Sequence, residues 1–148
     1  MPCPFCEIVT GHAPASMIYE DEAIAAFMTL RPSWPGECVV IPRDHIDHFT
    51  DVPDVLAQRI MVAAQHIGRQ VREVFAPERV GMLVHGYGVP HAHLIIVPQH
   101  GPHDLTSARF AQIEDGKIVF SAQRIAEAPR ATLDAHARLL ARALASLT

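Results

Sequence analysis

The sequence has no long hydrophobic run, no N-terminal export signal and no cluster of positive charge, and each absence excludes a class of function. A helix that crosses a bilayer needs about 20 consecutive apolar residues, and a secretory signal needs a basic region followed by an apolar stretch. We therefore expect neither membrane association nor export. The formal net charge is −4 and the lysines and arginines are scattered, which argues against a nucleic-acid partner.

Several motifs that mark common catalytic folds are also absent. The chain contains neither G-x-x-x-x-G-K-[ST] nor G-x-G-x-x-G, so neither a P-loop nor a dinucleotide-binding fold is predicted. It has no G-x-S-x-G turn for a serine nucleophile and no H-E-x-x-H helix for a metalloprotease.

Cysteine is scarce, with three residues in a chain of 148. A chain of this length fits one domain, residues 1–148, which can bury a core without disulfides. Few cysteines and no export signal predict a reducing compartment, so we expect a cytoplasmic protein. Cys38 lies in the apolar run 37–41, where a buried, inert thiol is expected.

Histidine, in contrast, is abundant, and two of the ten form an H-x-H pair. His91 and His93 follow a glycine-rich turn and precede the apolar run 94–97, which is typical of a buried strand. Side chains alternate along a strand, so both imidazoles are expected on one face. There they could serve a metal, a phosphate or each other; two histidines hydrogen-bonded at a sheet surface are the alternative.

Cys3 and Cys6 form a C-x-x-C pair, which has the spacing of half a tetrahedral zinc site. A thioredoxin-like redox pair is the rival, but that motif follows a strand, and none is predicted before Cys3. Unpaired surface thiols are a third interpretation. Together with the loop at His45 and the H-x-H pair, the cysteines suggest a Cys2His2 structural zinc site, in which one strand histidine binds the metal and the other faces a pocket.

The hydrophobic periodicity predicts an α+β fold, an antiparallel β-sheet of about five strands with one long central helix and a C-terminal helix. Asp51 is expected to cap the central helix and residues 76–77 to end it. An Asp-Gly pair predicts a hairpin at 113–120. The expected strands are 17–20, 23–27, 37–41, 80–84 and 94–97, and the expected helices are 53–75 and one from about 132.

The order of these segments resembles that of the histidine triad (HIT) proteins, whose pattern is His-φ-His-φ-His-φ-φ, with φ apolar, on the last strand of an antiparallel sheet. The resemblance covers residues 3–98, and residues 99–148 are a less typical C-terminal extension. It implies a homodimer that binds nucleotides, and many members act through a covalent nucleotidyl-histidine. The matching segments are Cys-Pro-Phe-Cys6, Tyr19-Glu-Asp-Glu22, Ala26-Phe27, Pro35-Gly36, Val39-Val-Ile-Pro-Arg-Asp-His45 and Val89-Pro-His-Ala-His93.

Carried over residue by residue, the resemblance assigns roles to the histidines and cysteines. His93 matches the nucleophile of the family. The role is chemically reasonable, because a neutral imidazole attacks well near pH 7 when its other nitrogen is held by a hydrogen bond. His91 matches the first histidine, which in zinc-binding members is a metal ligand. Its partners there correspond to Cys3, Cys6 and His45, and His48 is an alternative to His45.

The chain departs from the family pattern at several substrate-binding positions. Ile95 stands where the third histidine belongs, and Thr29 stands where an aspartate commonly holds the ribose hydroxyls. His100 or His103 could fold back to replace the missing histidine. The loop before the H-x-H pair is short, and the resemblance places Gly86, Tyr87, Gly88 and Val89 there against the substrate.

The resemblance implies a hydrolase or transferase acting on nucleoside phosphoramidates, dinucleoside polyphosphates or related nucleoside phosphates. Ile95 motivates the alternative, because an isoleucine neither donates a proton nor binds a phosphate oxygen. In that alternative the protein is a zinc-stabilised, nucleotide-binding dimer without catalytic activity.

Overall fold

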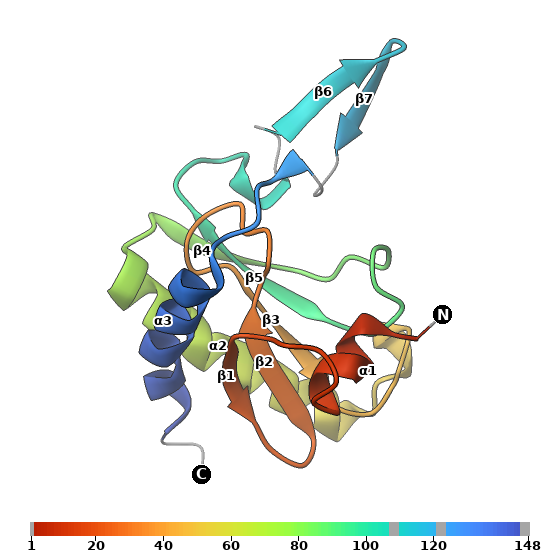
Figure 1. Ribbon diagram of the computed structural model, residues 1–148, viewed down its shortest axis with the longest axis vertical. Coiled ribbons are helices and arrows are strands. Elements are labelled where there is room, and N and C mark those ends of the chain that lie inside the picture. Colours follow the sequence, from red (N-terminus) through yellow and green to blue (C-terminus); the bar gives the residue numbers. More distant parts are fainter. Residues whose placement is uncertain (1, 107–109, 121–123, 146–148) are drawn as a thin grey trace.

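The computed structural model describes residues 2–106, 110–120 and 124–145, and its main element is a five-stranded sheet (Figure 1). The strands lie in the order β1-β2-β3-β5-β4, and every neighbouring pair is antiparallel. The predicted α+β fold, with five strands, a long helix and a C-terminal helix, is therefore confirmed. The strands are β1 (Met17–Glu20), β2 (Ile24–Met28), β3 (Cys38–Pro42), β4 (Arg79–Leu83) and β5 (Leu94–Gln99).

The turn between β1 and β2 is organised by one carboxylate. Asp21 Oδ1 accepts the backbone N–H groups of Ala23 at 2.8 Å and Ile24 at 2.9 Å. Its other oxygen accepts the hydroxyl of Tyr19 at 2.7 Å and a guanidinium N–H of Arg59 at 2.6 Å. An aspartate that bonds the backbone two and three residues ahead forms a turn without glycine. The hairpin predicted here is confirmed.

Helix α2 (Asp54–Phe75) covers one face of the sheet. Its buried stripe, which contains Ile60, Ile67 and Val71, follows the predicted helical spacing. The predicted cap at Asp51 is wrong, because residues 49–51 form a separate turn of 3₁₀ helix and Pro53 occupies the N-cap position. The helix ends at Ala76 in the left-handed conformation, with φ 48°.

The C-terminal helix α3 (Arg130–Ala141) continues into a 3₁₀ turn, residues 142–144. Leu133, Leu140 and Leu144 are buried in the same apolar cluster as α2, as their spacing predicts. Ser16 donates to Asp134 at 2.6 Å, which fastens α3 beside the start of β1. The segment after residue 98 thus contributes to the core on the α2 face.

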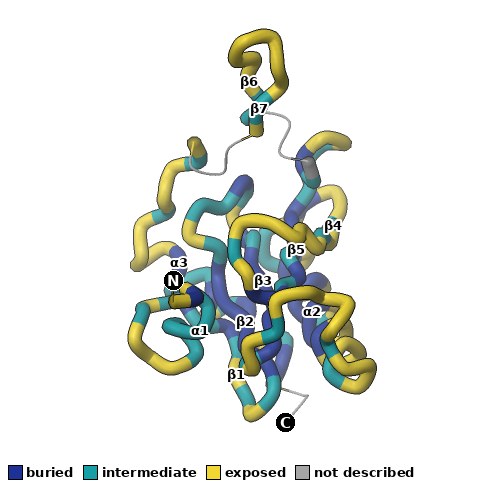
Figure 2. Tube along the Cα trace, turned by 90° about the vertical axis from the view of Figure 1, so that its right-hand side faces the viewer, coloured by how far each residue is buried: buried dark blue, intermediate teal, exposed yellow. Residues whose placement is uncertain are grey.

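Helix α1 (Pro4–Val9) covers the opposite face of the sheet, and it was not predicted from the sequence. Its side chains, with that of Ile95, pack against a second apolar cluster. Strands β2 and β3 are buried along their whole length between the two layers (Figure 2). The second cluster consists of Ala25, Phe27, Val39 and Ile41.

A two-stranded hairpin of β6 (Ala111–Glu114) and β7 (Lys117–Phe120) projects from the body of the molecule (Figures 1 and 2). Asp115 and Gly116 have φ angles of 49° and 74°, as a type I′ turn requires, so the predicted Asp-Gly hairpin is confirmed. Among the described residues, no helix combines the length and apolar character needed to cross a membrane.

Candidate active site and metal centre

The structure brings together two cysteines and two histidines from three separate segments: the start of α1, the loop after β3 and the residues before β5. The donor atoms of Cys3, Cys6, His45 and His91 all lie within 4.8 Å of one another. Cys3 Sγ is 3.5 Å from His91 Nδ1, and Cys6 Sγ is 3.3 Å from His45 Nδ1 and 3.7 Å from His91 Nδ1. A tetrahedral zinc ion with bonds of about 2.3 Å to sulfur and about 2.0 Å to nitrogen separates such ligands by about 3.5 Å. The donor set therefore fits zinc in chemistry and in spacing.

The ring of His91 is oriented by the end of β3. His91 is completely buried, and its Nε2 lies 2.8 Å from the carbonyl oxygen of Pro42. A carbonyl only accepts, so Nε2 carries the proton and Nδ1 presents its lone pair to the thiols. Burial lowers the pKa of His91, which the Pro42 carbonyl opposes and the nearby His45 and His93 reinforce. The neutral ring that a metal ligand needs is thus favoured.

Cys3 lies close enough to Cys6 to affect the ionisation of the Cys6 thiol. Cys3 is 9% exposed and Cys6 is partly buried at the start of α1. Burial raises the pKa of Cys6, and the neighbouring Cys3 and Glu7 raise it further. A divalent cation would reverse this preference, because it stabilises both thiolates.

His93 is also held by the main chain. Its Nδ1 lies 2.6 Å from the carbonyl oxygen of His91, so Nδ1 donates and Nε2 keeps its lone pair. The ring of Phe5 in α1 stands edge-on to both histidines, with centroid distances of 5.8 Å to His91 and 5.4 Å to His93. The two imidazoles therefore share the α1 face of the sheet. They precede β5 rather than belong to it, because the strand begins at Leu94.

Two further predicted substrate-binding residues, Ile95 and Thr29, lie on the side of the sheet that α1 covers. Ile95 packs into the apolar cluster beneath α1. The hydroxyl of Thr29 is buried and has no hydrogen-bond partner among the described residues. Along β3, Thr29 is level with Glu37, to which its backbone N–H donates. His93 lies one residue beyond the pair formed by Val40 and Leu94, so four residues of β3 separate the two levels. Thr29 and His93 are thus about 13 Å apart along the strand direction.

The loop at residues 86–89 is mostly open to solvent. Tyr87 is 82% exposed, and apart from the adjacent residues no described atom lies within 4 Å of the positions that a Cβ would take at Gly86 or Gly88. Gly88 has a φ of 98°, which a side chain would oppose. Val89 is partly buried, and its carbonyl accepts the N–H of His91 at 2.8 Å.

The alternative histidines lie elsewhere. His48 is exposed and is not among the residues of the Cys-His cluster. The ring of His100 contacts that of Trp34 in a tilted arrangement, at a centroid distance of 4.5 Å, beyond the far end of β5. Strand β5 separates His100 from His93 by roughly 20 Å, and His103 follows in the same loop as His100. Within one chain, these residues do not replace the missing third histidine.

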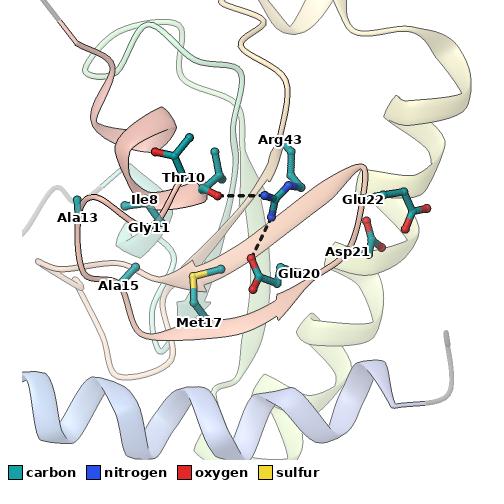
Figure 3. A pocket seen from close by; sticks show the side chains of 11 residues that line it. Ile8, Thr10, Gly11, Ala13, Ala15, Met17, Glu20, Asp21, Glu22 and Arg43 are labelled. Atoms are coloured by element: carbon teal, nitrogen blue, oxygen red, sulfur yellow. Dashed lines mark hydrogen bonds and ion pairs between the residues drawn. The ribbon is translucent and has the colours of Figure 1, made fainter.

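Sequence reasoning missed Arg43, which joins α1 to the sheet. Its guanidinium donates to Glu20 on β1 at 2.9 Å and to the carbonyl oxygen of Val9 at 3.0 Å (Figure 3). It lines a cleft of about 720 Å³ between α1 and the β1–β2 hairpin. No residue pattern marks this role, because one partner of Arg43 is a backbone carbonyl; the sequence shows only that Arg43 stands between Pro42 and His45.

Comparisons with known proteins agree with this architecture. The HIT domain family model matches residues 10–143. The chain is 34% identical to Protein hit of Bacillus subtilis over 107 residues, 69% of this chain and 74% of that protein. It is 28% identical over 105 residues to adenosine 5′-monophosphoramidase hnt1 of Schizosaccharomyces pombe, which covers 67% of this chain and 75% of that one. A zinc-bound histidine triad family protein from Mycobacterium smegmatis superposes with a TM-score of 0.71 and 29% identity, over 99% of this chain and 96% of the other.

Proposed function

Because the chain belongs to the HIT domain family, we propose that it is a nucleotide-binding hydrolase or transferase that works through a covalent nucleotidyl-His93 intermediate. The observation that carries this proposal is the 2.6 Å contact between His93 Nδ1 and the His91 carbonyl, which leaves Nε2 as the nucleophilic nitrogen. Attack on an α-phosphate by Nε2 divides one displacement into two, each with an in-line geometry.

The proposed substrates are nucleoside phosphoramidates, dinucleoside polyphosphates or related nucleoside phosphates. The relative in Schizosaccharomyces pombe, an adenosine 5′-monophosphoramidase, supports the first class. The proposed contacts are the open loop at residues 86–89 for the phosphates, and Ile95 and Thr29 for the nucleoside. A separation of about 13 Å between His93 and Thr29 suits a nucleotide that extends along the strands.

We also propose a structural zinc ion bound by the four-residue Cys-His cluster. When bound, the ion would cross-link α1, the loop after β3 and the segment before β5, and it would supply no reacting group. The metal would also explain why two thiols lie beside two imidazoles rather than in a disulfide. Because these thiols must stay reduced to bind zinc, we propose that the protein works in a reducing, cytoplasmic compartment.

A homodimer is proposed from the exposed apolar surface of the edge strand. Strand β4 lies at one end of the sheet, and Met82 and the following Val84 are 44% and 42% exposed. On α2, Val55, Met61 and Val62 are exposed as well. Unpaired strand edges with apolar side chains commonly pair with a second chain. Sedimentation equilibrium tests this proposal, and a monomer at micromolar concentration would contradict it.

The second candidate function is a zinc-stabilised nucleotide-binding dimer without catalysis. The packing of Ile95 into the apolar cluster favours it, because that position offers no proton and no phosphate contact. The two functions differ in one outcome. The second predicts nucleotide binding at micromolar concentration with no covalent adduct.

The deciding experiment is a panel of nucleoside phosphoramidates and dinucleoside polyphosphates, assayed with wild type, His93→Ala and His48→Ala. We expect wild type and His48→Ala to turn over at least one substrate and His93→Ala to lose activity. Intact-mass analysis of acid-quenched wild type should detect the nucleotidyl adduct. Micromolar binding by calorimetry without turnover or adduct would reject the enzyme and establish the second function.

A further inference from the structure

The pairing of β4 with β5 brings the end of β4, which His85 follows, beside the start of β5, which His93 precedes. The register runs without a break from Arg79 opposite Gln99 to Leu83 opposite Ile95. Residues directly opposite in an antiparallel pair project from the same face of the sheet, and so do residues two positions further along each strand. Two positions beyond the last pair, the residues are His85 and His93. Both histidines lie just beyond the last pair, at the same end of the two strands, and side-chain alternation indicates the face that carries Ile95 for each of them.

The side chain of His85 is available for proton transfer. His85 is exposed, and its Nδ1 lies 3.3 Å from the carbonyl oxygen of Tyr87. This carbonyl holds a proton on Nδ1, so Nε2 is the nitrogen that gains and releases the exchangeable proton.

The proposed reaction needs such a group, and several other candidate residues do not supply it. Ile95 has no proton to give. His45 and His91 belong to the Cys-His cluster, and His100 lies beyond the far end of β5. Expulsion of an amine or an alkoxide from phosphorus is slow unless the leaving atom is protonated as the bond breaks.

We propose that His85 is the general acid and base of the reaction at His93, an inference that rests on the proposed function. In the first step, Nε2 of His93 forms a bond to the α-phosphorus while the bond from phosphorus to the leaving nitrogen or oxygen breaks. The electron pair of the broken bond goes to the leaving atom, which takes a proton from the His85 imidazolium. The leaving group departs as a neutral amine or alcohol, and His85 becomes neutral.

In the second step, water attacks the phosphorus of nucleotidyl-His93. Neutral His85 takes a proton from the attacking water, and the electron pair of the phosphorus–nitrogen bond returns to His93. The nucleoside monophosphate leaves, and both histidines regain their starting protonation. His85 thus supplies the proton transfer that Ile95 cannot.

The test compares two adenylyl substrates that differ only in the leaving group. An alkylamine phosphoramidate needs a proton on its leaving nitrogen, whereas a p-nitrophenyl ester releases a stable anion without one. First-turnover release is measured by rapid quench for wild type, His85→Gln, His85→Asn and the control His48→Gln. We expect the His85 variants to lose about a hundredfold or more in rate on the phosphoramidate and to retain the wild-type rate of nitrophenolate release within about threefold.

The second step gives an independent readout. Without a base for the attacking water, the His85 variants should accumulate nucleotidyl-His93 from the p-nitrophenyl ester, which intact-mass analysis detects. Equal losses on both substrates, or no loss on either, would overturn the assignment of His85. Wild type that releases nitrophenolate and forms the adduct retains the proposed function whatever His85 does, and wild type that does neither would overturn both proposals.

Discussion

The carbonyl oxygen of Pro42 lies 2.8 Å from Nε2 of His91, so the last residue of β3 fixes which nitrogen of that histidine faces the cysteines. The same histidine offers its own carbonyl to Nδ1 of His93 at 2.6 Å. The end of β3 therefore orients the proposed metal ligand, His91, which in turn orients the proposed nucleophile, His93. Displacement of the Pro42 carbonyl would change the orientation of both rings.

The first prediction concerns metal content. Elemental analysis of the purified protein should find about one zinc per chain, and Cys3→Ser should lower both the zinc content and the melting temperature, because one of four ligands is lost. Cys38→Ala is the matched control, since Cys38 is completely buried in the sheet and lies outside the cluster. Full zinc occupancy in Cys3→Ser would contradict the proposed ligand set.

The second prediction concerns the contact between Arg43 and α1. Arg43→Ala removes the hydrogen bonds to Glu20 and to the Val9 carbonyl. We expect the free energy of unfolding to fall by about 1 kcal/mol and zinc transfer to a chromogenic chelator to accelerate, because α1 carries both cysteines. Arg138→Ala, an exposed change on α3, should alter neither quantity. An unchanged chelation rate in Arg43→Ala would show that this contact does not stabilise the metal centre.

The third prediction concerns acid stability and Asp21. Burial by itself raises the pKa of Asp21, but hydrogen bonds from Tyr19, Ala23, Ile24 and Arg59 outweigh it and lower the pKa below its ordinary value. A carboxylate with a lowered folded pKa stabilises the protein above its unfolded pKa of about 3.9, and this stabilisation is lost as the pH falls through the folded pKa.

Urea unfolding of wild type should therefore show decreasing stability below about pH 4. Asp21→Asn should be less stable than wild type at pH 7 and should lose less on acidification. Glu22→Gln is the matched control, because Glu22 makes only an exposed ion pair with Arg59. Parallel pH profiles for wild type and Asp21→Asn would contradict the assignment.

The fourth prediction tests whether residues 1–148 form one domain. Leu140 on α3 is completely buried in the cluster that also contains α2. Leu140→Ala should lower the free energy of unfolding by about 2–5 kcal/mol while the protein retains a single unfolding transition. Two separated transitions, one insensitive to Leu140→Ala, would indicate that the C-terminal segment folds on its own.

Local patterns in the sequence were sufficient to predict most of the elements. The stripe of α2 and the leucines of α3 repeat at helical spacing, and Asp115-Gly116 is a turn signal that needs no tertiary context. Helix α1 escaped prediction because six residues are too few to show a period. The cap at Asp51 failed because its segment forms a turn of its own and Pro53 fixes the entry into α2.

The candidate site was predictable only in part. Residue types and the family resemblance bring Cys3, Cys6, His45 and His91 into one hypothesis, and the structure places their donor atoms within 4.8 Å. The hydrogen bond from His91 to Pro42 joins residues 49 positions apart through main-chain geometry, so no residue pattern reveals it. Arg43 was missed for the same reason, because its partners include a backbone carbonyl.

Three of the four residues from Pro42 to His45 make separate contacts. The Pro42 carbonyl orients His91, the Arg43 guanidinium donates a hydrogen bond to α1, and the His45 imidazole lies beside the cysteines. Chain length between these points is consequently more constrained than side-chain identity. Asp44 is exposed, so other residues can replace it. Insertion of even one amino acid between Pro42 and His45, in contrast, would move these three groups relative to one another and break their contacts. Engineered variants and natural homologues that keep the centre should therefore vary in composition here and never in spacing.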